Sequence, residues 1–229
     1  MIRQANNVQK TKWKGIVTIK KLNSVSIKDE YVEKKSVLNQ NVLQNNTLKK
    51  KKEKQVDIKL EKIKKFLNKK GITSVWHFTD RSNLKSIMEH GILSLTKIEK
   101  QNIKVEFTGA DSLSHSLDHY NGLDKYVHLA FIKDHPMYYI AKNRRSIFDP
   151  IWIEIDISVL FEQNTLFCNK VANDNRAKLF KFDKIKKKIN FDKMLFSPIF
   201  DEYKEARKAE ILVLDHISPD KILGVFNGK

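Results

Sequence analysis

Hydrophobic and polar positions alternate in several short stretches of the chain. The clearest is residues 151–157 (IWIEIDI), where the isoleucines fall on one side of an extended chain and the Trp, Glu and Asp on the other. Residues 126–132 (YVHLAFI) alternate in the same way. The apolar runs at 75–78, 210–214 and 222–226 indicate further strands with buried side chains.

Other stretches have helical spacing. Residues 57–70 carry apolar positions three or four apart with lysines between them, and Gly71 follows as a stop signal. A second short helix ends at Gly91, and Pro136 opens a third that runs through Ala141. Residues 200–207 form either a short helix or an irregular segment. Scattered strands and short helices without regular βαβ alternation predict an α+β fold with a mixed or antiparallel sheet.

The first 55 residues show little periodicity. Residues 14–20 (KGIVTIK) are compatible with a short strand, and the Asn- and Gln-rich residues 39–47 are typical of a linker. We therefore expect a basic N-terminal extension over residues 1–55, flexible or weakly structured, and one main domain over residues 56–229.

Positive charge is concentrated in the N-terminal part. The 229-residue chain has a formal net charge of +17, and residues 1–70 hold 20 Lys and Arg against 6 Asp and Glu. A run of four lysines occupies residues 49–52. Such runs attract polyanions, of which nucleic acid is the usual one, although a solubilising tail has the same composition.

A second basic stretch lies between residues 181 and 193. Its cations alternate with phenylalanines, so the aromatic rings could stack on bases while the lysines hold phosphates. The alternative is an amphipathic helix with the phenylalanines inward and the lysines outward. The residues concerned are Lys181, Lys184, Lys186, Lys187, Lys188 and Lys193, with Phe180, Phe182 and Phe191.

Several protein classes are excluded by what the sequence lacks. A single cysteine, Cys168 in an apolar context, excludes an internal disulfide framework. Neither a dinucleotide-binding G-x-G-x-x-G nor a P-loop is present. His115 and His119 are four apart, but no further ligands accompany them, so we expect no metal. No apolar run is long enough for a membrane helix, and residues 1–10 lack the apolar stretch of a signal peptide, so we expect a cytoplasmic protein.

Polar residues at strand ends are the candidates for chemistry. His77 and Thr79 end one strand, and Glu210 begins another beside Arg207 and Lys208. A carboxylate there could hydrogen-bond a ribose hydroxyl, stabilise a cationic centre or accept a proton, or it could be a strand-end ion-pair partner. His77 could likewise bind a ligand or be a core histidine. Residues 171–177 (VANDNRA) suit a ligand loop or a plain turn.

Taken together and in order, these segments resemble the DarT family, toxins of the ADP-ribosyltransferase fold that modify bases of single-stranded DNA. The resemblance spans about residues 60–226 and depends on the order and spacing of the segments. They are His77-Phe78-Thr79, Asn83-Leu84, Gly91-Ile92, residues 126–131 with His135-Pro136-Met137, Val171-Ala172-Asn173 and residues 207–213 (RKAEILV).

The resemblance implies a split mixed or antiparallel sheet with short helices around a cleft for NAD, which is the substrate. His77 would bind a ribose of NAD, with Thr79, Asn83 and Gly91 beside it. Glu210 would be the catalytic glutamate. Either Tyr138 or Tyr139 would stack on the nicotinamide.

The resemblance also implies the partners. Single-stranded DNA would be the acceptor, and an antitoxin of the macrodomain or NADAR type would remove the modification in a toxin–antitoxin or phage-defence system. We expect the DNA to contact Lys181, Lys184, Lys186, Lys187, Lys188, Arg207 and Lys208.

One departure from the family pattern concerns the target base. Family members that modify thymidine carry an arginine between the segments matching Gly91 and Tyr126, and residues 92–125 contain none. Arg144, Arg145 or Arg176 could substitute. The sequence fits guanine at least as well as thymine as the target. An acceptor in RNA or protein, or a nucleic-acid-binding module without activity, remains an alternative.

Overall fold

The chain is described by a computed structural model over residue 58, residues 60–107 and residues 112–228. From Lys59 onward the chain forms one compact unit. The whole of the expected N-terminal extension over residues 1–55, with the strand at 14–20 and the linker at 39–47, lies outside the described residues. The boundary at residues 55–56 therefore remains a prediction.

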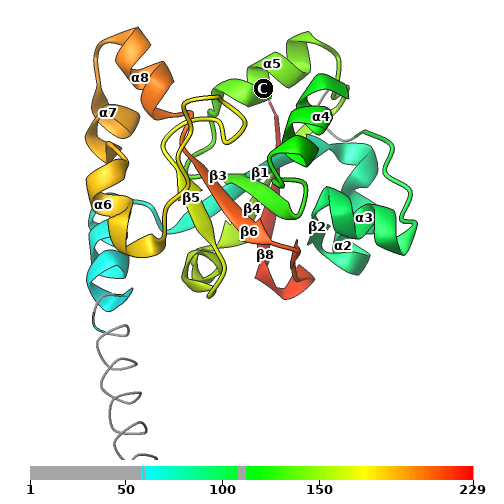
Figure 1. Cartoon of the computed structure of the whole chain (residues 1–229), viewed down its shortest axis with the longest axis horizontal. Helices are drawn as coiled ribbons and strands as arrows, with labels where there is room; N and C mark the ends of the chain where they lie inside the picture. The colour runs from blue at the N-terminus through cyan, green and yellow to red at the C-terminus, as the bar shows by residue number, and fades with distance from the viewer. Residues whose placement is uncertain (1–57, 59, 108–111, 229) are drawn as a thin grey trace, which may run out of the picture. The chain divides into compact units, whose positions relative to one another are not determined.

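A six-stranded sheet runs through the centre of this unit (Figure 1). Every pair of neighbouring strands in it is antiparallel. Of the two kinds of sheet that the sequence left open, mixed or antiparallel, the structure therefore has the antiparallel one. The spatial order is β5 (Leu166–Cys168), β6 (Glu210–Leu214), β3 (Tyr126–Ala130), β1 (Ser74–Asp80), β4 (Pro150–Asp156) and β8 (Ile222–Asn227). A separate pair joins β2 (Ile92–Leu93) to β7 (His216–Ile217).

Short helices surround the sheet. Figure 1 shows α6, α7 and α8 gathered at the β5 side, next to the helix of residues 60–69, and α2, α3 and α4 at the other side. Their bounds are α2 (Leu84–His90), α3 (Leu95–Gln101), α4 (Ser112–Tyr120), α5 (Pro136–Asn143), α6 (Ile185–Lys188), α7 (Phe191–Phe196) and α8 (Phe200–Ala206).

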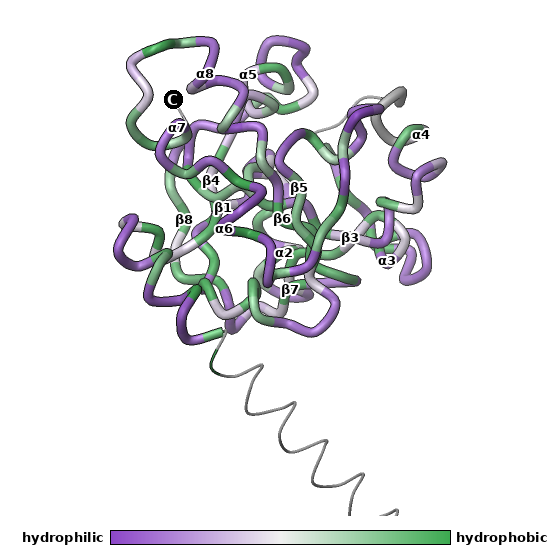
Figure 2. Tube along the Cα trace, turned by 60° about the vertical axis from the view of Figure 1, so that its left-hand side comes forward, coloured by the Kyte–Doolittle hydropathy of each residue, from purple (hydrophilic) through white to green (hydrophobic). Residues whose placement is uncertain are grey.

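The main core lies on one face of the sheet. Alternate side chains of the central strands, among them Val75, Leu129 and Ile153, pack against the helix of residues 60–69 and against α6 and α7. A smaller cluster on the opposite face packs Tyr138 of α5 on Trp152. Figure 2 shows the corresponding hydrophobic stretches in the strands. The period-two alternation of residues 151–157 therefore places the isoleucines in the main core, while the opposite face of this strand is apolar at Trp152 and polar at Glu154 and Asp156.

The sheet opens between β1 and β3. Strand β1 pairs with β4 along its whole length, but with β3 only through Trp76 and Ala130. Strand β3 in turn pairs fully with β6. The two halves therefore diverge beyond the Trp76–Ala130 pair, and the gap leaves room for a ligand within the sheet itself.

The predicted elements are found with small shifts of their ends. The strand predicted to reach Ile132 ends at Ala130, because the chain then bends toward Asp134, whose φ is 119°. The segment 200–207 is helical as α8. Strand β5 and helices α3, α4 and α7 were not predicted, since each is short and takes its stability from tertiary packing, and α6 lies where an amphipathic helix was one of two alternatives.

A buried carboxylate fixes the end of β1. Asp80 is 3% exposed and accepts hydrogen bonds from Ser82 N (3.0 Å), Phe148 N (2.6 Å) and Asp149 N (2.9 Å). Burial alone would raise the pKa of Asp80, but these backbone donors outweigh burial and hold the pKa below its ordinary value.

We expect Asp80→Ala to lower the free energy of unfolding at neutral pH by about 3 kcal/mol, because three backbone N–H groups lose their acceptor. A depressed pKa contributes stability above the unfolded pKa, and that contribution disappears as the pH falls through the folded value. Urea denaturation at several pH values measures both effects. The difference between wild type and variant should shrink in acid, and an equal difference at every pH would contradict the assignment.

Candidate active site

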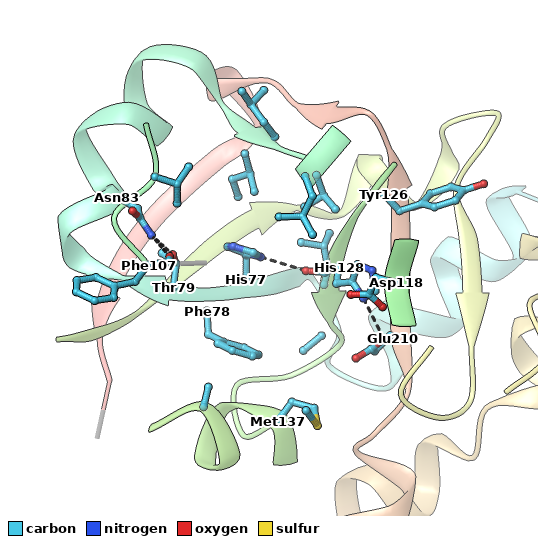
Figure 3. A pocket seen from close by; sticks show the side chains of 18 of the residues that line it. His77, Phe78, Thr79, Asn83, Phe107, Asp118, Tyr126, His128, Met137 and Glu210 are labelled. Atoms are coloured by element: carbon cyan, nitrogen blue, oxygen red, sulfur yellow. Dashed lines mark hydrogen bonds and ion pairs between the residues drawn. The ribbon is translucent and has the colours of Figure 1, made fainter. Parts of the chain in front are cut away.

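A cavity of about 230 Å³ occupies the gap in the sheet (Figure 3). Consecutive residues of β1 (76–79) and of β3 (126–130) line it, although neighbouring side chains of a strand point to opposite faces. Both sets reach one cavity because the strands diverge there. Helix α2, residues 103–107 and the start of α5 complete a mostly apolar wall with few polar groups, as is typical of a small-molecule site.

Glu210 is the buried carboxylate of this cavity. It begins β6 opposite Ala130 of β3 and is 6% exposed. Its Oε2 accepts a hydrogen bond from the Ala172 backbone N–H (2.9 Å) and lies 3.3 Å from Nδ1 of His128. Its Oε1 lies 3.9 Å from Nε2 of His135. The carboxylate is therefore oriented by three neighbours from separate segments.

His128 stabilises the ionised form of that carboxylate. Besides Glu210, the His128 ring hydrogen-bonds the Leu123 backbone, and Asp118 adds a second negative charge nearby. Burial alone would lower the pKa of His128, but these acceptors and charges outweigh it and raise the pKa. A ring that donates from both nitrogens is an imidazolium.

The same interactions act on Glu210 in the opposite direction. Burial alone would raise the pKa of Glu210, but the hydrogen bond and charge of His128, with smaller contributions from His135 and the Ala172 N–H, lower it. Glu210 is thus held as a carboxylate inside the cavity, available to accept a proton or to face a positive centre.

His77 closes the gap between the diverging strands. Its Nδ1 lies 3.1 Å from the carbonyl oxygen of His128, where a backbone N–H would otherwise complete the ladder. The pocket walls enclose the ring, and this burial lowers the pKa of His77 to about 4. The ring is therefore neutral. Because a carbonyl only accepts, Nδ1 carries the proton and Nε2 is left as a hydrogen-bond acceptor.

Asn83 connects the pocket wall to the start of α2. Its Nδ2 donates to the Thr79 hydroxyl (3.1 Å) and to the Phe107 carbonyl (2.5 Å), and its Oδ1 accepts from Glu106 N (3.1 Å). The amide thus fixes residues 106–107 in place. Thr79, which accepts from Asn83, keeps its hydroxyl proton available for another acceptor.

Gly91 also lines the cavity, and the backbone explains why this position is glycine. Its φ is +82°, and a Cβ would lie 2.1 Å from the Ile217 carbonyl oxygen. The close approach of α2's end to β7 therefore requires glycine. All five residues assigned to catalysis or NAD, namely Glu210, His77, Thr79, Asn83 and Gly91, line this one cavity.

The predicted DNA-contacting cations do not line the cavity. Lys186 donates to the Lys62 carbonyl (3.3 Å), and Lys181 to the Gln163 carbonyl (3.4 Å). Arg207 forms an ion pair with Asp134, and Lys208 one with Glu205.

The phenylalanines of the second basic stretch point inward. Phe180 and Phe182 pack against the main core, and Phe191 is buried in it. This favours the amphipathic interpretation of the stretch. The DNA contacts assigned to its lysines remain a prediction.

The aromatic lining differs from the expectation. Neither Tyr138 nor Tyr139 lines the cavity: Tyr138 is packed on Trp152, and Tyr139 donates to Asp134. The ring surfaces come instead from Trp76, Phe78, Phe107 and Tyr126. Of the three arginines considered as substitutes, Arg144 lines the cavity, whereas Arg145 and Arg176 do not.

Sequence reasoning missed His128, His135 and Asp118 as site residues. For His128 the alternation along the strand was a signal, because it places His128 on the same face as Tyr126 and Ala130. Ala130 lies opposite Glu210 in the sheet, so His128 is on the face nearest that carboxylate. For Asp118 no local signal distinguishes a cavity residue from a surface helix position.

Among the residues that the structure describes, no group of three or more His, Cys, Asp or Glu is arranged to hold a metal ion. Within the same residues, no helix has both the length and the apolar character needed to cross a membrane.

Comparison with known proteins gives one family and several structures. Residues 76–228 match a family model described as ssDNA thymidine ADP-ribosyltransferase, DarT. A search of curated proteins finds no match.

The structural similarities support the fold. "Thermosipho africanus DarTG in complex with ADP-ribose" gives a TM-score of 0.57 at 20% identity, covering 68% of this chain and 44% of that one. "Thermus sp. 2.9 DarT in complex with ADP-ribosylated ssDNA" gives 0.55 at 15% identity, covering 68% and 81%. The same Thermus protein with carba-NAD+ gives 0.51 at 16% identity, covering 67% and 81%.

We expect His128→Gln to raise the pKa of Glu210. Glutamine can still donate to Oε2 but carries no charge, so the carboxylate loses its main cationic neighbour. Ionised Glu210 would then contribute less stability at neutral pH, and the loss of that contribution on acidification would be complete at a higher pH. NMR titration of ¹³C-labelled glutamate carboxyls measures the shift. The exposed His216 serves as control, since His216→Gln should leave the pKa of Glu210 unchanged.

Proposed function

This chain belongs to the DarT family, described as ssDNA thymidine ADP-ribosyltransferase, and from that premise we propose that it transfers ADP-ribose from NAD+ to thymidine in single-stranded DNA with Glu210 as catalytic residue. The observation that carries the proposal is the ionised carboxylate of Glu210, buried in the cavity between β1 and β3. Because this chain spans 44% of the Thermosipho africanus chain, its activity and partners are proposed here from its own residues.

The cavity residues fit NAD+ as a substrate. The unprotonated Nε2 of His77 can accept a hydrogen bond from a ribose hydroxyl, and the Thr79 hydroxyl can donate to a second polar group. The apolar and aromatic walls suit the flat rings of a dinucleotide. NAD+ supplies the reactive bond between ribose and nicotinamide.

Glu210 has two roles in this proposal. Its negative charge faces the ribose carbon where positive charge develops, and the surrounding protein excludes water that would screen it. It then accepts the proton that the target base releases. His128 and the Ala172 N–H orient the carboxylate for both roles, because they hold Oε2 and leave Oε1 toward His135.

Single-stranded DNA is the acceptor that suits an enclosed cavity. A base must leave its stack to reach Glu210, and unpaired strands release bases at low energetic cost. We propose that Arg144 at the cavity rim contacts the DNA, in place of the arginine that residues 92–125 lack. The lysines between 181 and 188, with Arg207 and Lys208, remain candidates for the path of the strand outside the cavity.

Thymidine is the preferred target because the matching family model describes it. The missing arginine left guanine and thymine open on sequence grounds. If Arg144 takes the place of that arginine, its absence from residues 92–125 no longer favours guanine over thymine.

We further infer that the chain acts as a toxin whose effect an antitoxin reverses. A reversible chemical mark on DNA blocks its use as template, so a cell that makes the enzyme needs protection. The expectation of a macrodomain or NADAR antitoxin follows from the family resemblance. Action in the cytoplasm, where DNA and NAD+ occur together, is consistent with the proposal.

Intact-mass measurement on oligonucleotides tests the function. The chain is mixed with NAD+ and four single-stranded oligonucleotides, each enriched in one base. We expect the mass of one ADP-ribosyl group on the thymine oligonucleotide. Transfer only to RNA or protein would replace DNA as the acceptor, and NAD+ left intact with every acceptor would indicate a binding module without activity.

We predict that Glu210→Gln lowers kcat for transfer about 10³-fold, because the amide has neither the charge nor the basicity of the carboxylate. Quenched-flow mass analysis with saturating NAD+ measures this. Glu205→Gln, on the exposed side of α8, is the control and should retain full activity. A loss of less than tenfold would exclude Glu210 as catalytic residue.

Arg144→Ala should weaken oligonucleotide binding about tenfold and lower the slope of log K against log salt by about 1, as expected for one lost phosphate contact. Fluorescence anisotropy at several salt concentrations gives both quantities. Arg145→Ala is the matched control, since Arg145 is the next residue and does not line the cavity. Equal effects of the two variants would contradict a role for Arg144 at the rim.

A further inference from the structure

His135 is placed in a way that its helix-capping role does not explain. It is the N-cap of α5, and its Nδ1 accepts a hydrogen bond from Met137 N (3.3 Å). An accepting nitrogen carries no proton, so in the neutral ring the proton is on Nε2. The cap therefore uses Nδ1, and Nε2 on the other side of the ring carries the N–H.

Among the described residues that N–H has no partner at hydrogen-bond geometry, and the Lys208 carbonyl, which acts on the ring, does not satisfy it. His135 is 2% exposed, lines the cavity, and its Nε2 makes no hydrogen bond within the described chain. Such orphaned donors are rare in protein interiors, and a ligand is one of the explanations for them. The nearest charged atom is Oε1 of Glu210 at 3.9 Å, too far for a hydrogen bond.

The ring stays neutral at this position. Burial lowers the pKa of His135, and the opposing influences of the Glu210 charge and the Lys208 carbonyl do not overcome it. The positive charges of His128 and Lys208 act in the same direction as burial. Glu210 and His135 therefore present a charged acceptor and a neutral donor side by side.

We propose that Oε1 of Glu210 and the Nε2–H of His135 together recognise the target base by its imino N–H and the adjacent carbonyl, which makes His135 a specificity-determining residue. The inference rests on the proposed function and deepens it. One base edge can reach both groups with hydrogen bonds of about 2.9 Å, because the two protein atoms are only 3.9 Å apart.

This donor–acceptor pair selects among the four bases. Thymine presents an imino N–H between two carbonyls, and guanine presents one beside a single carbonyl. Adenine and cytosine have an unprotonated ring nitrogen beside an amino group, so they can match the pair only with the amino group on Oε1 and the ring nitrogen on the Nε2–H of His135. In that arrangement no imino N–H faces Glu210. The pair therefore places only thymine and guanine with an imino nitrogen at the carboxylate, and the choice between these two must be made by other groups, because guanine adds an amino group where thymine has its second carbonyl.

The transfer step balances with these two residues. A bond forms between the imino nitrogen and the ribose carbon, and the bond from that carbon to nicotinamide breaks with its electron pair leaving on nicotinamide. The imino proton goes to Oε1 of Glu210. His135 keeps its proton and stabilises the base carbonyl while the proton leaves the neighbouring nitrogen.

Two substitutions separate recognition from capping. In His135→Asn the side-chain oxygen can replace Nδ1 as the cap, but no donor reaches the position of Nε2. In His135→Gln the amide N–H can reach that position, while the cap is lost. His216→Asn, exposed and away from the cavity, controls for the loss of a histidine.

The measured quantity is the ratio of kcat/KM for transfer to a thymine oligonucleotide over the rate of NAD+ hydrolysis, in which water is the acceptor. We expect His135→Asn to lower this ratio about 10- to 100-fold, as for the loss of one base-reading hydrogen bond. His135→Gln should restore most of this ratio, although the variant melts at a lower temperature because its helix cap is lost. His216→Asn should leave the ratio unchanged. An equal fall of transfer and hydrolysis in His135→Asn, or no rescue by glutamine, would overturn the proposal.

Thio-substituted bases give a second, independent readout. Replacing one thymine carbonyl oxygen by sulfur weakens that acceptor, so the wild type should lose transfer to either 2-thiothymine or 4-thiothymine while His135→Asn shows no further loss with the same base. If the losses from thio-substitution and from His135→Asn add up with both 2-thiothymine and 4-thiothymine, neither carbonyl contacts His135, and this result would contradict the proposal. A wild type that neither transfers nor hydrolyses NAD+ would instead refute the proposed function, and this result is distinct from a wild type that transfers without dependence on His135.

Discussion

The buried negative charge of Glu210 is the constraint on which the site depends. A carboxylate that is 6% exposed is tolerated only if hydrogen bonds and opposite charge replace its water. Two segments that are distant in sequence supply them: β3 contributes the charge and hydrogen bond of His128, and the loop after β5 contributes the Ala172 N–H. The antiparallel pairing of β3 with β6 brings the first of these into place.

The opening in the sheet is the second requirement, and it is tied to the first. If β1 and β3 paired along their length, His77 would face a closed ladder and no cavity would exist beside Glu210. Instead the strands separate after the Trp76–Ala130 pair, and His77 bonds the His128 carbonyl across the gap. His128, whose ring contacts Glu210, thus also accepts the hydrogen bond of His77 through its carbonyl oxygen. These two contacts hold the β1 side and the β6 side of the pocket in one arrangement.

Three histidines line the pocket in different protonation states, and each state follows from its surroundings. His77 is neutral because burial lowers its pKa to about 4, and its acceptor nitrogen is free for a ribose hydroxyl. His128 is charged because it lies between carboxylates and a carbonyl. His135 is neutral and carries its proton on Nε2, because its Nδ1 accepts from Met137 N. One residue type therefore supplies an acceptor, a cation and a donor within one site.

The sequence by itself determined most of the strands and the α+β character, because alternation is a local property, and the order of its motifs made His77 and Glu210 candidates for the site. It also made Gly91 conspicuous, although the reason, a Cβ that would collide with the Ile217 carbonyl, is tertiary. Only the tertiary structure decided that His128 and His135 face Glu210, that Arg144 rather than Arg145 lines the cavity, and that Phe180 and Phe182 point inward. Those facts depend on strand register, on a gap in the sheet and on which helix face is covered, and such long-range pairings leave no signature in any one segment.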